Sequence, residues 1–426
     1  MRDRPEPAGV SSAADAVEQA YRQEWAQVVA TTIRVARDIQ IAEDCVQEAF
    51  TAALLKWPHE GVPDRPGAWL TTVAVRNALQ VHRRNATLTR KLPQLLPDDP
   101  GALPVDPSSG TVFEQLPDDR LRLIFTCCHP ALAPEARVAL TLRLVCGLTS
   151  VEVAKAFLVT QSTMQARITR AKKKIADAGI AYRTPDPAEF PERLTSVLDT
   201  VHLVFNEGYR PASGDLLIRA DLTARALQTA RMLHELLPHS AETTALLALL
   251  LLIEARRDAR VDSHGEAVDL EHQDRSRWDR ALIDEGLTLL AAAVRGDDAG
   301  KYTVMASLAA VHDTSAGWAQ TDWAHMLALY DVLQQHWPTP VVALARAVAV
   351  SFARGPDEGL AALEPLVHDP ALTTYPYLPA ARADMLRRLG RVDDAAAGYR
   401  EAILLTANAA EARFFQGRID DLTARD

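Results

Sequence analysis

The chain has 426 residues, of which 48% are hydrophobic, and its formal net charge is −10 at pH 7. A chain of this length can bury more than one core, so several domains are expected. The polar stretch from Met1 to Ser12 lacks the apolar run of a signal peptide, and the longest apolar run, Ala245 to Ile253, is too short to span a bilayer. We therefore expect a cytoplasmic protein without membrane association.

The four cysteines favour reduced thiols over a disulfide framework, because Cys45, Cys127, Cys128 and Cys146 all fall inside helical patterns. Cys127 and Cys128 beside His129 invite a zinc interpretation. However, adjacent cysteines without a second ligand pair at suitable spacing make a poor tetrahedral site. No metal and no cofactor is expected.

A small helical domain is predicted over residues 13–88. From Asp15 to Arg84 apolar residues recur at three- and four-residue spacing, with turn signals only around Pro58 to Pro66. A linker is expected over residues 89–118, since the stretch from Leu92 to Asp119 holds six prolines and six acidic residues but no basic one. Such a composition cannot bury a core.

The next segment, residues 119–183, has the pattern of a DNA-binding module. Between Leu148 and Ile175 two short helices are predicted around a tight turn, and Thr149 with Glu152 form a capping box at the start of the first. Small and cationic side chains on the second helix suit a DNA major groove, and two packed core helices are the alternative. The apolar stripe of that helix is Met164, Ile168, Ala171 and Ile175, and its opposite face is Ser162, Thr163, Ala166, Thr169, Arg170 and Lys173.

Charge separates this segment from the rest of the chain. From Arg120 to Arg183 there are 11 basic and 3 acidic residues, a balance of +8, whereas from Thr184 to Asp426 there are 23 basic and 36 acidic residues, a balance of −13. A phosphate-binding surface requires such a local positive surplus. The acidic half is expected to be repelled by DNA and to serve another purpose.

The last domain, residues 191–426, is predicted to be helical throughout, with a weak repeat near its end. Gly355 precedes Gly390 by thirty-five residues in a similar frame, in a helix pair that begins at Pro340. Small residues that let two helices touch are typical of a tetratricopeptide (TPR) repeat. The matching residues are Ala383, Leu386, Gly390, Ala395, Tyr399 and Ala402, with Asn408 beyond. We expect an all-α protein ending in a TPR-like α-solenoid, with an irregular helical bundle as the alternative to the solenoid.

Motifs in the first domain resemble a known family. The stretch from Ala42 to Phe50 (AEDCVQEAF), followed by Pro66 to Asn77 (PGAWLTTVAVRN) and then by Arg83 and Arg84, resembles regions 2.2 to 2.4 of an extracytoplasmic-function (ECF) RNA polymerase sigma factor. The basic segment resembles region 4 of the same proteins. The acidic half resembles the TPR-like extension of one sigma subgroup, and Asn206 to Tyr209 looks like a signature of it, as do Asp322, Trp323 and Tyr330.

The resemblance implies that the chain binds core RNA polymerase and promoter DNA. In sigma factors the helix matching Asp44, Gln47 and Glu48 docks on the clamp helices of the largest catalytic subunit, and the polymerase flap is a further expected contact. From the residues alone this helix presents carboxylates and amides beside a buried Val46 and Phe50, which is also the pattern of a solvated face. The expected core-binding residues are Glu43, Asp44, Gln47 and Glu48.

The resemblance also implies DNA contacts. Guanidinium groups can hold phosphates and an amide can read a base edge. The loop from Trp57 to Pro66 is expected to capture an unstacked base, whereas Trp69 is expected in the core. The residues expected at the promoter −10 element are Arg76, Asn77, Arg83 and Arg84. Those expected at the −35 element are Ser162, Thr163, Gln165, Arg167, Arg170 and Lys173, with Lys172 and Lys174 on phosphates.

Catalysis is not expected, because the chain has no glycine-rich phosphate loop or nucleophile motif and its twelve histidines are scattered. The competing interpretation is a helix-turn-helix regulator that senses a ligand or partner through the solenoid, but such a protein would not need the first domain. The acidic half is expected to modulate activity, by folding back on the basic segment, by supporting the DNA-binding domains or by binding a protein partner.

Overall fold

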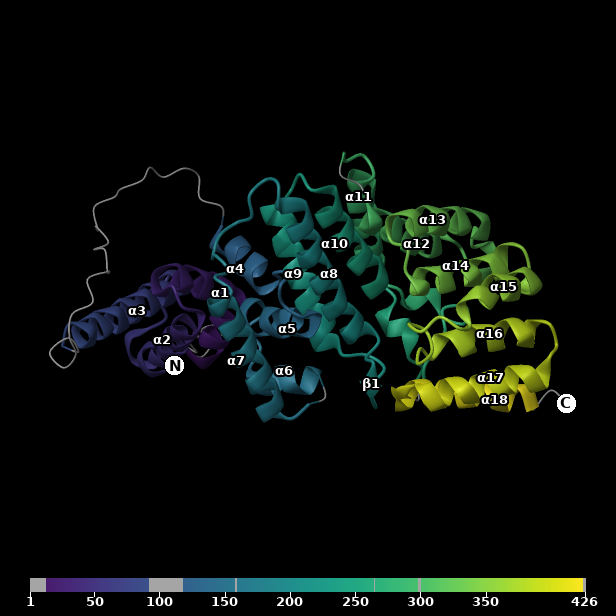
Figure 1. The fold of residues 1–426 in the computed structure, drawn as a ribbon, viewed down its shortest axis with the longest axis horizontal. Helices are drawn as coiled ribbons and strands as arrows, with labels where there is room; N and C mark the ends of the chain where they lie inside the picture. The colour runs from purple at the N-terminus through teal and green to yellow at the C-terminus, as the bar shows by residue number, and fades with distance from the viewer. Residues whose placement is uncertain (1–12, 92–117, 158, 264, 298–299, 424–426) are drawn as a thin grey trace, which may run out of the picture. The chain divides into compact units, whose positions relative to one another are not determined.

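The computed structural model describes residues 13–91, 118–157, 159–263, 265–297 and 300–423, and most of the linker predicted over residues 89–118 lies outside them. The chain forms two compact units, residues 1–200 and residues 201–426 (Figure 1). The described residues are helical except for turns, loops and two very short strands, so the predicted all-α class is confirmed. No described helix combines the length and the apolar character needed to cross a membrane.

Unit 1 begins with three mutually packed helices, α1 (Ala13–Ala36), α2 (Ile39–Glu60) and α3 (Pro66–Lys91). The Asp38 carboxylate caps α2 by accepting a hydrogen bond from the backbone N–H of Ile41. Helix α2 continues past Pro58, because a proline in the last turn removes only one backbone hydrogen bond. It ends at Glu60, and the next residue, Gly61, caps it with a φ of 86°. The loop before α3 is therefore shorter than the predicted loop, and Trp57 lies in the helix with a buried side chain.

The second part of unit 1 contains the predicted helix-turn-helix. It consists of α4 (Asp119–Cys127), α5 (Pro134–Leu140), the π-helix Thr141–Val145, α6 (Ser150–Ala156) and α7 (Gln161–Asp177). The capping box is present, since the Thr149 hydroxyl accepts from the N–H of Glu152 and the Glu152 carboxylate accepts from the N–H of Thr149. The predicted apolar stripe of α7 is buried in full: Met164, Ile168, Ala171 and Ile175.

Helices account for most of unit 2. Helix α8 (Phe190–Tyr209) begins in unit 1 and ends in unit 2. After it come β1 (Ser213–Gly214), α9 (Ala220–Leu236), α10 (Ala241–Glu254), α11 (Arg280–Ala293), α12 (Lys301–Thr314), α13 (Trp323–His336), α14 (Pro340–Ala353), α15 (Pro356–Leu363), α16 (Tyr377–Arg388), α17 (Val392–Leu405), β2 (Ala407–Asn408) and α18 (Ala409–Thr423). Four short 3₁₀ turns lie at Arg257–Arg260, Arg275–Arg277, Trp318–Gln320 and Glu364–Leu366. The long apolar run noted in the sequence forms α10, which packs against α9, α11 and α12 as a buried helix.

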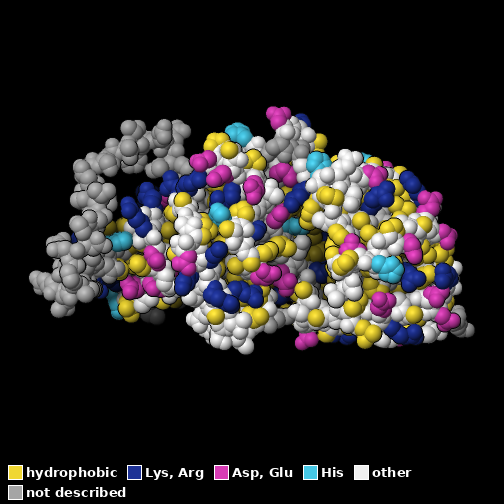
Figure 2. Space-filling model, in the orientation of Figure 1, with side chains coloured by type: hydrophobic (Ala, Val, Ile, Leu, Met, Phe, Trp, Pro, Cys, Tyr) yellow, Lys and Arg dark blue, Asp and Glu magenta, His cyan; other side chains and the backbone are white. Residues whose placement is uncertain are grey.

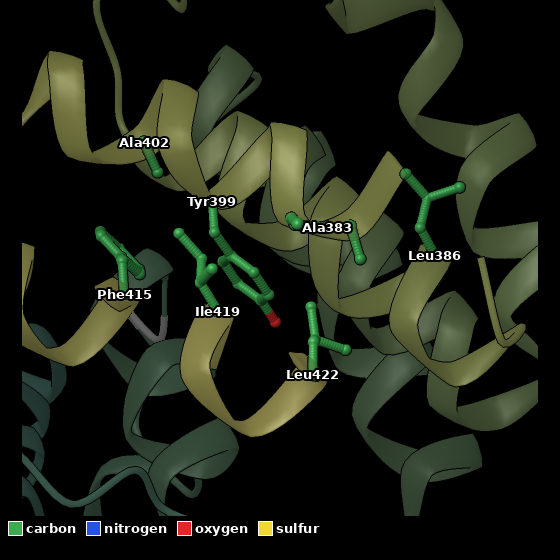
Figure 3. Packing of buried hydrophobic residues seen from close by; sticks show 9 residues of the cluster. Ala383, Leu386, Tyr399, Ala402, Phe415, Ile419 and Leu422 are labelled. Atoms are coloured by element: carbon green, nitrogen blue, oxygen red, sulfur yellow. The ribbon is translucent and has the colours of Figure 1, made fainter. Parts of the chain in front are cut away.

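The residues of the predicted repeat pack as the helix pair α16 and α17, with α18 against it. Tyr399 of α17 lies between Ala383 of α16 and the side chains of α18 (Figure 3). Gly355 lies between α14 and α15, and Gly390 lies between α16 and α17. Their φ angles are 114° and 75°, values that L-residues with a Cβ rarely adopt. Both glycines therefore occupy the turns that the repeat pattern predicts.

A buried asparagine connects the start and the end of unit 2. Strands β1 and β2 pair in parallel, and Asn408 is 1% exposed. Its Nδ2 donates to the carbonyl oxygens of Pro211 and Leu216, at 3.0 Å each. Its Oδ1 accepts from the backbone N–H groups of Ala410 at 2.9 Å and Glu411 at 3.2 Å. One amide thus joins the segment after α8 to the first turn of α18.

Replacing Asn408 with alanine is expected to lower the free energy of unfolding of unit 2 by about 2–4 kcal/mol, because buried carbonyl and N–H groups lose their partners. Urea unfolding followed by circular dichroism measures the change, with the exposed Gln416→Ala as the control. A loss below about 1 kcal/mol in Asn408→Ala would contradict this role for the side chain.

Candidate nucleic-acid interface

The residues predicted to meet the −35 element lie mostly on the exposed side of α7. Ser162, Thr163, Gln165, Arg170 and Lys173 are all exposed, opposite the buried stripe. Lys and Arg side chains gather over the part of unit 1 where α6 and α7 lie (Figure 2). Hydroxyl, amide and cationic groups on one helix face provide the donors and acceptors needed to read base edges and bind phosphates.

Arg167 differs from these five residues. It is half-buried, and its guanidinium carbon lies 5.3 Å from the ring centroid of Phe157 at the end of α6. A cation over an aromatic face is attracted to the ring. The contact therefore braces the two helices of the motif while leaving part of the side chain near the surface.

Helix α3 carries the residues predicted at the −10 element. Arg76, Arg83 and Arg84 are exposed, whereas Asn77 is half-buried and its Nδ2 donates to a carboxylate oxygen of Glu48 at 3.2 Å. The structure thus brings together a residue predicted to read DNA and one predicted to bind the polymerase. Trp69, at the start of the same helix, is half-buried with its ring centroid 5.6 Å from that of Trp57.

The predicted core-binding residues divide into two groups on α2. Asp44, Gln47 and Glu48 are exposed, over the buried side chains of Val46 and Phe50, as the sequence predicts. Glu43 is buried, and its side chain is only 4% exposed. Three of the four residues therefore form an open polar surface, and the fourth faces inward.

Glu43 forms ion pairs with two cations from the second part of unit 1. Its two carboxylate oxygens contact Arg143 of the π-helix and Lys172 of α7, whose side chains are 9% and 11% exposed. Lys172 also donates to the side-chain oxygen of Gln40, at 2.9 Å, and Gln47 donates to Glu43, at 3.3 Å. Lys172, predicted on a phosphate, is thus bound within the protein. Sequence reasoning missed Arg143, although an arginine inside the apolar run Thr141–Val145 signals a buried cation that needs a partner.

Aromatic residues extend the same contact. The indole N–H of Trp25 donates to the carbonyl oxygen of Leu144 at 3.1 Å, and a Cβ on Gly147, whose φ is +74°, would come within 3.1 Å of the Trp25 ring. The Tyr182 hydroxyl donates to the carbonyl oxygens of Ala30 at 2.9 Å and Asp119 at 3.2 Å, and burial raises the pKa of Tyr182 far above its usual value. The two parts of unit 1 therefore share a contact defined by specific hydrogen bonds and close packing.

The cysteines considered for zinc lie in the interior of unit 1. Cys127 and Cys128 are fully buried free thiols. Burial raises the pKa of Cys127 well above its usual value and that of Cys128 to about 11. Burial therefore disfavours the thiolate at both positions.

Two of the signature segments of unit 2 have packing roles. A Cβ on Gly208 would lie 2.6 Å from the backbone nitrogen of Thr223, so the close approach of α8 and α9 requires glycine there. The guanidinium carbon of Arg260 lies over the ring of Tyr209, 3.9 Å from the ring centroid. The Asp322 carboxylate caps α13 by accepting from the backbone N–H of His325.

Three family models match the chain: Sigma-70 region 2 over residues 20–87, Sigma-70 region 4 over residues 122–175, and a family of unknown function (DUF6596) over residues 193–294. An uncharacterised protein of Rhizobium meliloti (strain 1021) is 40% identical over 403 residues, which cover 93% of this chain and 94% of that protein. The probable ECF RNA polymerase sigma factor SigI of Mycobacterium tuberculosis, in two strains, is 32% identical over 179 residues, which cover 41% of this chain and 59% of SigI.

The reactivity of the buried thiols gives a direct test of how α4 packs in unit 1. In the native protein at pH 8, Cys127 and Cys128 are expected to resist iodoacetamide, because they are protonated and shielded, and to react once urea unfolds the chain. Peptide mass spectrometry measures the extent of labelling, with the partly buried Cys146 as the internal reference. Labelling of Cys127 or Cys128 as fast as Cys146 would contradict the packing of α4.

Proposed function

Because this chain belongs to the sigma-70 family of transcription factors, with regions 2 and 4 ahead of a helical domain of unknown function, we propose that it binds core RNA polymerase and directs initiation at a specific set of promoters. Within the family we assign it to an ECF-type subgroup with a TPR-like extension. The main support is that one chain carries both an exposed acidic surface on α2 and an exposed cationic reading face on α7.

In this proposal α2 provides the contact with the polymerase. Asp44, Gln47 and Glu48 are exposed on one side of the helix and offer carboxylate and amide groups to a basic partner surface, the clamp helices of the largest subunit. The polymerase flap is the proposed partner of region 4. The acidic surface is rigid, because the residues beneath it are buried in the α1–α3 core.

Promoter recognition is divided between two helices. On α7, Arg170 and Lys173 would contact the −35 element directly, with Ser162, Thr163 and Gln165 nearer the N-terminal end, where a recognition helix meets base edges. On α3, the guanidinium groups of Arg76, Arg83 and Arg84 would hold phosphates of the −10 element, beside Asn77. Arg167, braced on Phe157, would contribute from the flank of the interface.

Unit 2 is proposed to modulate this activity through its helix pairs. The pairs α14–α15 and α16–α17 each turn at a glycine. Small residues bring the helices of the second pair together, as in tetratricopeptide repeats. Stacked helix pairs of this type create extended surfaces for protein or peptide partners. The proposed modulator is therefore a protein contact made by unit 2, either within the chain or with another protein.

Run-off transcription with purified core polymerase, using the promoter of the chain's own operon as template, tests the proposal. The wild-type protein is expected to yield a discrete transcript. Asp44→Arg and Arg170→Glu are each expected to reduce it at least about tenfold, since each reverses a charge at an interface. Glu18→Arg and Arg22→Glu, which reverse exposed charges on α1 outside both proposed interfaces, serve as matched controls and should leave the transcript unchanged.

The competing interpretation predicts a different result. A helix-turn-helix regulator would bind DNA without the polymerase, and the polymerase would gain no start-site specificity from it. Loss of the transcript in Arg170→Glu but not in Asp44→Arg would contradict the polymerase contact assigned to α2.

A further inference from the structure

Two arginine side chains lie on tyrosine rings where the first and last segments of unit 2 meet. Arg210 directly follows α8, and its guanidinium carbon lies 4.7 Å from the ring centroid of Tyr377 at the start of α16. Arg260 ends the first 3₁₀ turn, lies over the ring of Tyr209, and donates to the backbone carbonyl oxygen of the same tyrosine. Each ring attracts the cation above it. Both guanidinium groups are therefore held by aromatic contacts that neutralise no charge.

The two cations outnumber the carboxylates paired with them. A carboxylate oxygen of Glu411, on α18, lies 3.7 Å from Nε of Arg210. Within the described residues, Arg260 contacts the ring and the carbonyl oxygen of Tyr209, and no carboxylate pairs with it. Burial is the main cause of the lowered pKa of Arg260, and the nearby charge of Arg210 lowers that pKa further. The site therefore carries an uncompensated positive charge, in a half of the chain whose balance is −13.

The donors that would bind an anion are open on both arginines. The Arg210 side chain is 56% exposed, and its two terminal nitrogens donate to no atom of the residues that the structure describes. Arg260 donates through Nη1 and leaves its other N–H groups without an acceptor among those residues. The Glu411 carboxylate, in contrast, is 12% exposed and accepts from the hydroxyls of Tyr377 and Thr406. An anion from outside would therefore meet free guanidinium groups, with Glu411 turned toward its own partners.

We propose that Arg210 and Arg260 form a carboxylate-binding site through which unit 2 recognises an acidic segment of a partner protein. The inference rests on the proposed function, in which unit 2 modulates initiation through a protein contact, and it names the chemistry of that partner. Tyr209 and Tyr377 are positioning residues of this site, because each supports one guanidinium. Glu411 is a third positioning residue, because its ion pair orients Arg210.

The shape of the donors favours a carboxylate. A guanidinium is planar and presents its N–H groups as a fork that matches the two oxygen atoms of one carboxylate. The tyrosine rings beside Arg210 and Arg260 offer apolar faces to the residues that flank an acidic side chain. The site therefore provides both a charged contact and an apolar one.

An acidic protein segment fits these surroundings better than DNA does. The acidic half has 36 acidic and 23 basic residues, and a duplex with one phosphate charge every ~1.7 Å would meet many of its carboxylates. A short acidic segment places a few carboxylates at one spot, and salt screens exposed charges more than about 8 Å away. A local cationic spot in an acidic domain therefore selects a short segment of local negative charge.

The buried Asn408 fixes the spacing of the site. Its side chain donates to the carbonyl oxygen of Pro211, which follows Arg210, and accepts from the backbone N–H of Glu411. One amide thus holds Arg210 and Glu411 next to each other, although they lie far apart in the sequence. The signature segment from Asn206 to Tyr209 leads directly into the site. Folding of unit 2 therefore forms the site before a partner binds, which reduces the ordering cost of binding.

The test measures the binding of a fluorescein-labelled oligoglutamate peptide to the full-length protein by fluorescence anisotropy. An oligoglutamine peptide of the same length, which lacks the carboxylates, is the reference ligand. Arg210→Gln and Arg260→Gln each remove one cation of the site. Arg391→Gln is the matched control, because its side chain is 55% exposed, against 56% for Arg210, and pairs with Asp394 at the start of α17.

The wild-type protein is expected to bind oligoglutamate at least about tenfold more tightly than oligoglutamine. Arg210→Gln and Arg260→Gln should each weaken oligoglutamate binding at least about fivefold, whereas Arg391→Gln should stay within about twofold of the wild type. Equal affinity of the wild type for the two peptides, or equal losses in all three variants, would overturn the site. Duplex DNA that displaces the peptide and loses affinity in Arg210→Gln would show a DNA contact and would also overturn it.

Failure of the proposed function is distinguishable from failure of the site, because the peptide titration uses no polymerase. If run-off transcription with the wild-type protein gives no discrete transcript, the proposed function fails, while the titration still decides the site. If Arg210→Gln loses helical content by circular dichroism, Arg210→Lys replaces it, since lysine keeps the charge but lacks the planar fork. Arg210→Lys is expected to weaken oligoglutamate binding at least about threefold, and an unchanged affinity would overturn the assignment of Arg210.

Discussion

One carboxylate removed from water constrains the whole of unit 1. Glu43 cannot stay charged in the interior without partners, and its two partners come from elements that lie far along the chain, the π-helix and α7. Satisfying that single group fixes α2 against both elements. Two cations of the basic segment from Arg120 to Arg183 are therefore paired inside the protein. The exposed cations of that segment, among them Arg170 and Lys173 on α7, remain available for an external anion.

The sequence predicts the features of unit 1 that depend on local periodicity. The buried stripe of α7, the capping box of Thr149 and Glu152 and the exposed side of α2 all follow from helical spacing within one segment. The pairing of Glu43 with Lys172 depends on residues 129 positions apart, and helical spacing carries no information at that range. Helix α2 likewise passes Pro58, because a proline signals the end of a helix without fixing the residue at which the helix ends.

In unit 2 the family resemblance identifies signature residues, and the structure shows what several of them contact. Gly208 is required where α8 and α9 touch, and Tyr209 supports the guanidinium of Arg260. Trp323 stacks on Phe352 of α14 with ring centroids 4.3 Å apart, next to the cap formed by Asp322. These side chains hold helices together, so the signature segments describe the architecture of the domain, and a partner would be recognised by other, exposed residues.

Some carboxylates of the acidic half have partners within unit 2. Glu242 accepts hydrogen bonds from the backbone N–H groups of Gly300, Tyr302 and Thr303, and Asp313 is buried against Arg256. The remaining exposed carboxylates act over only about 8 Å at physiological ionic strength, because salt screens them beyond that distance. The modulation proposed for unit 2 therefore requires a contact with, or a close approach to, unit 1, the DNA or the polymerase. Folding back and supporting the DNA-binding regions are both contact mechanisms, and they differ in whether the contact competes with the promoter.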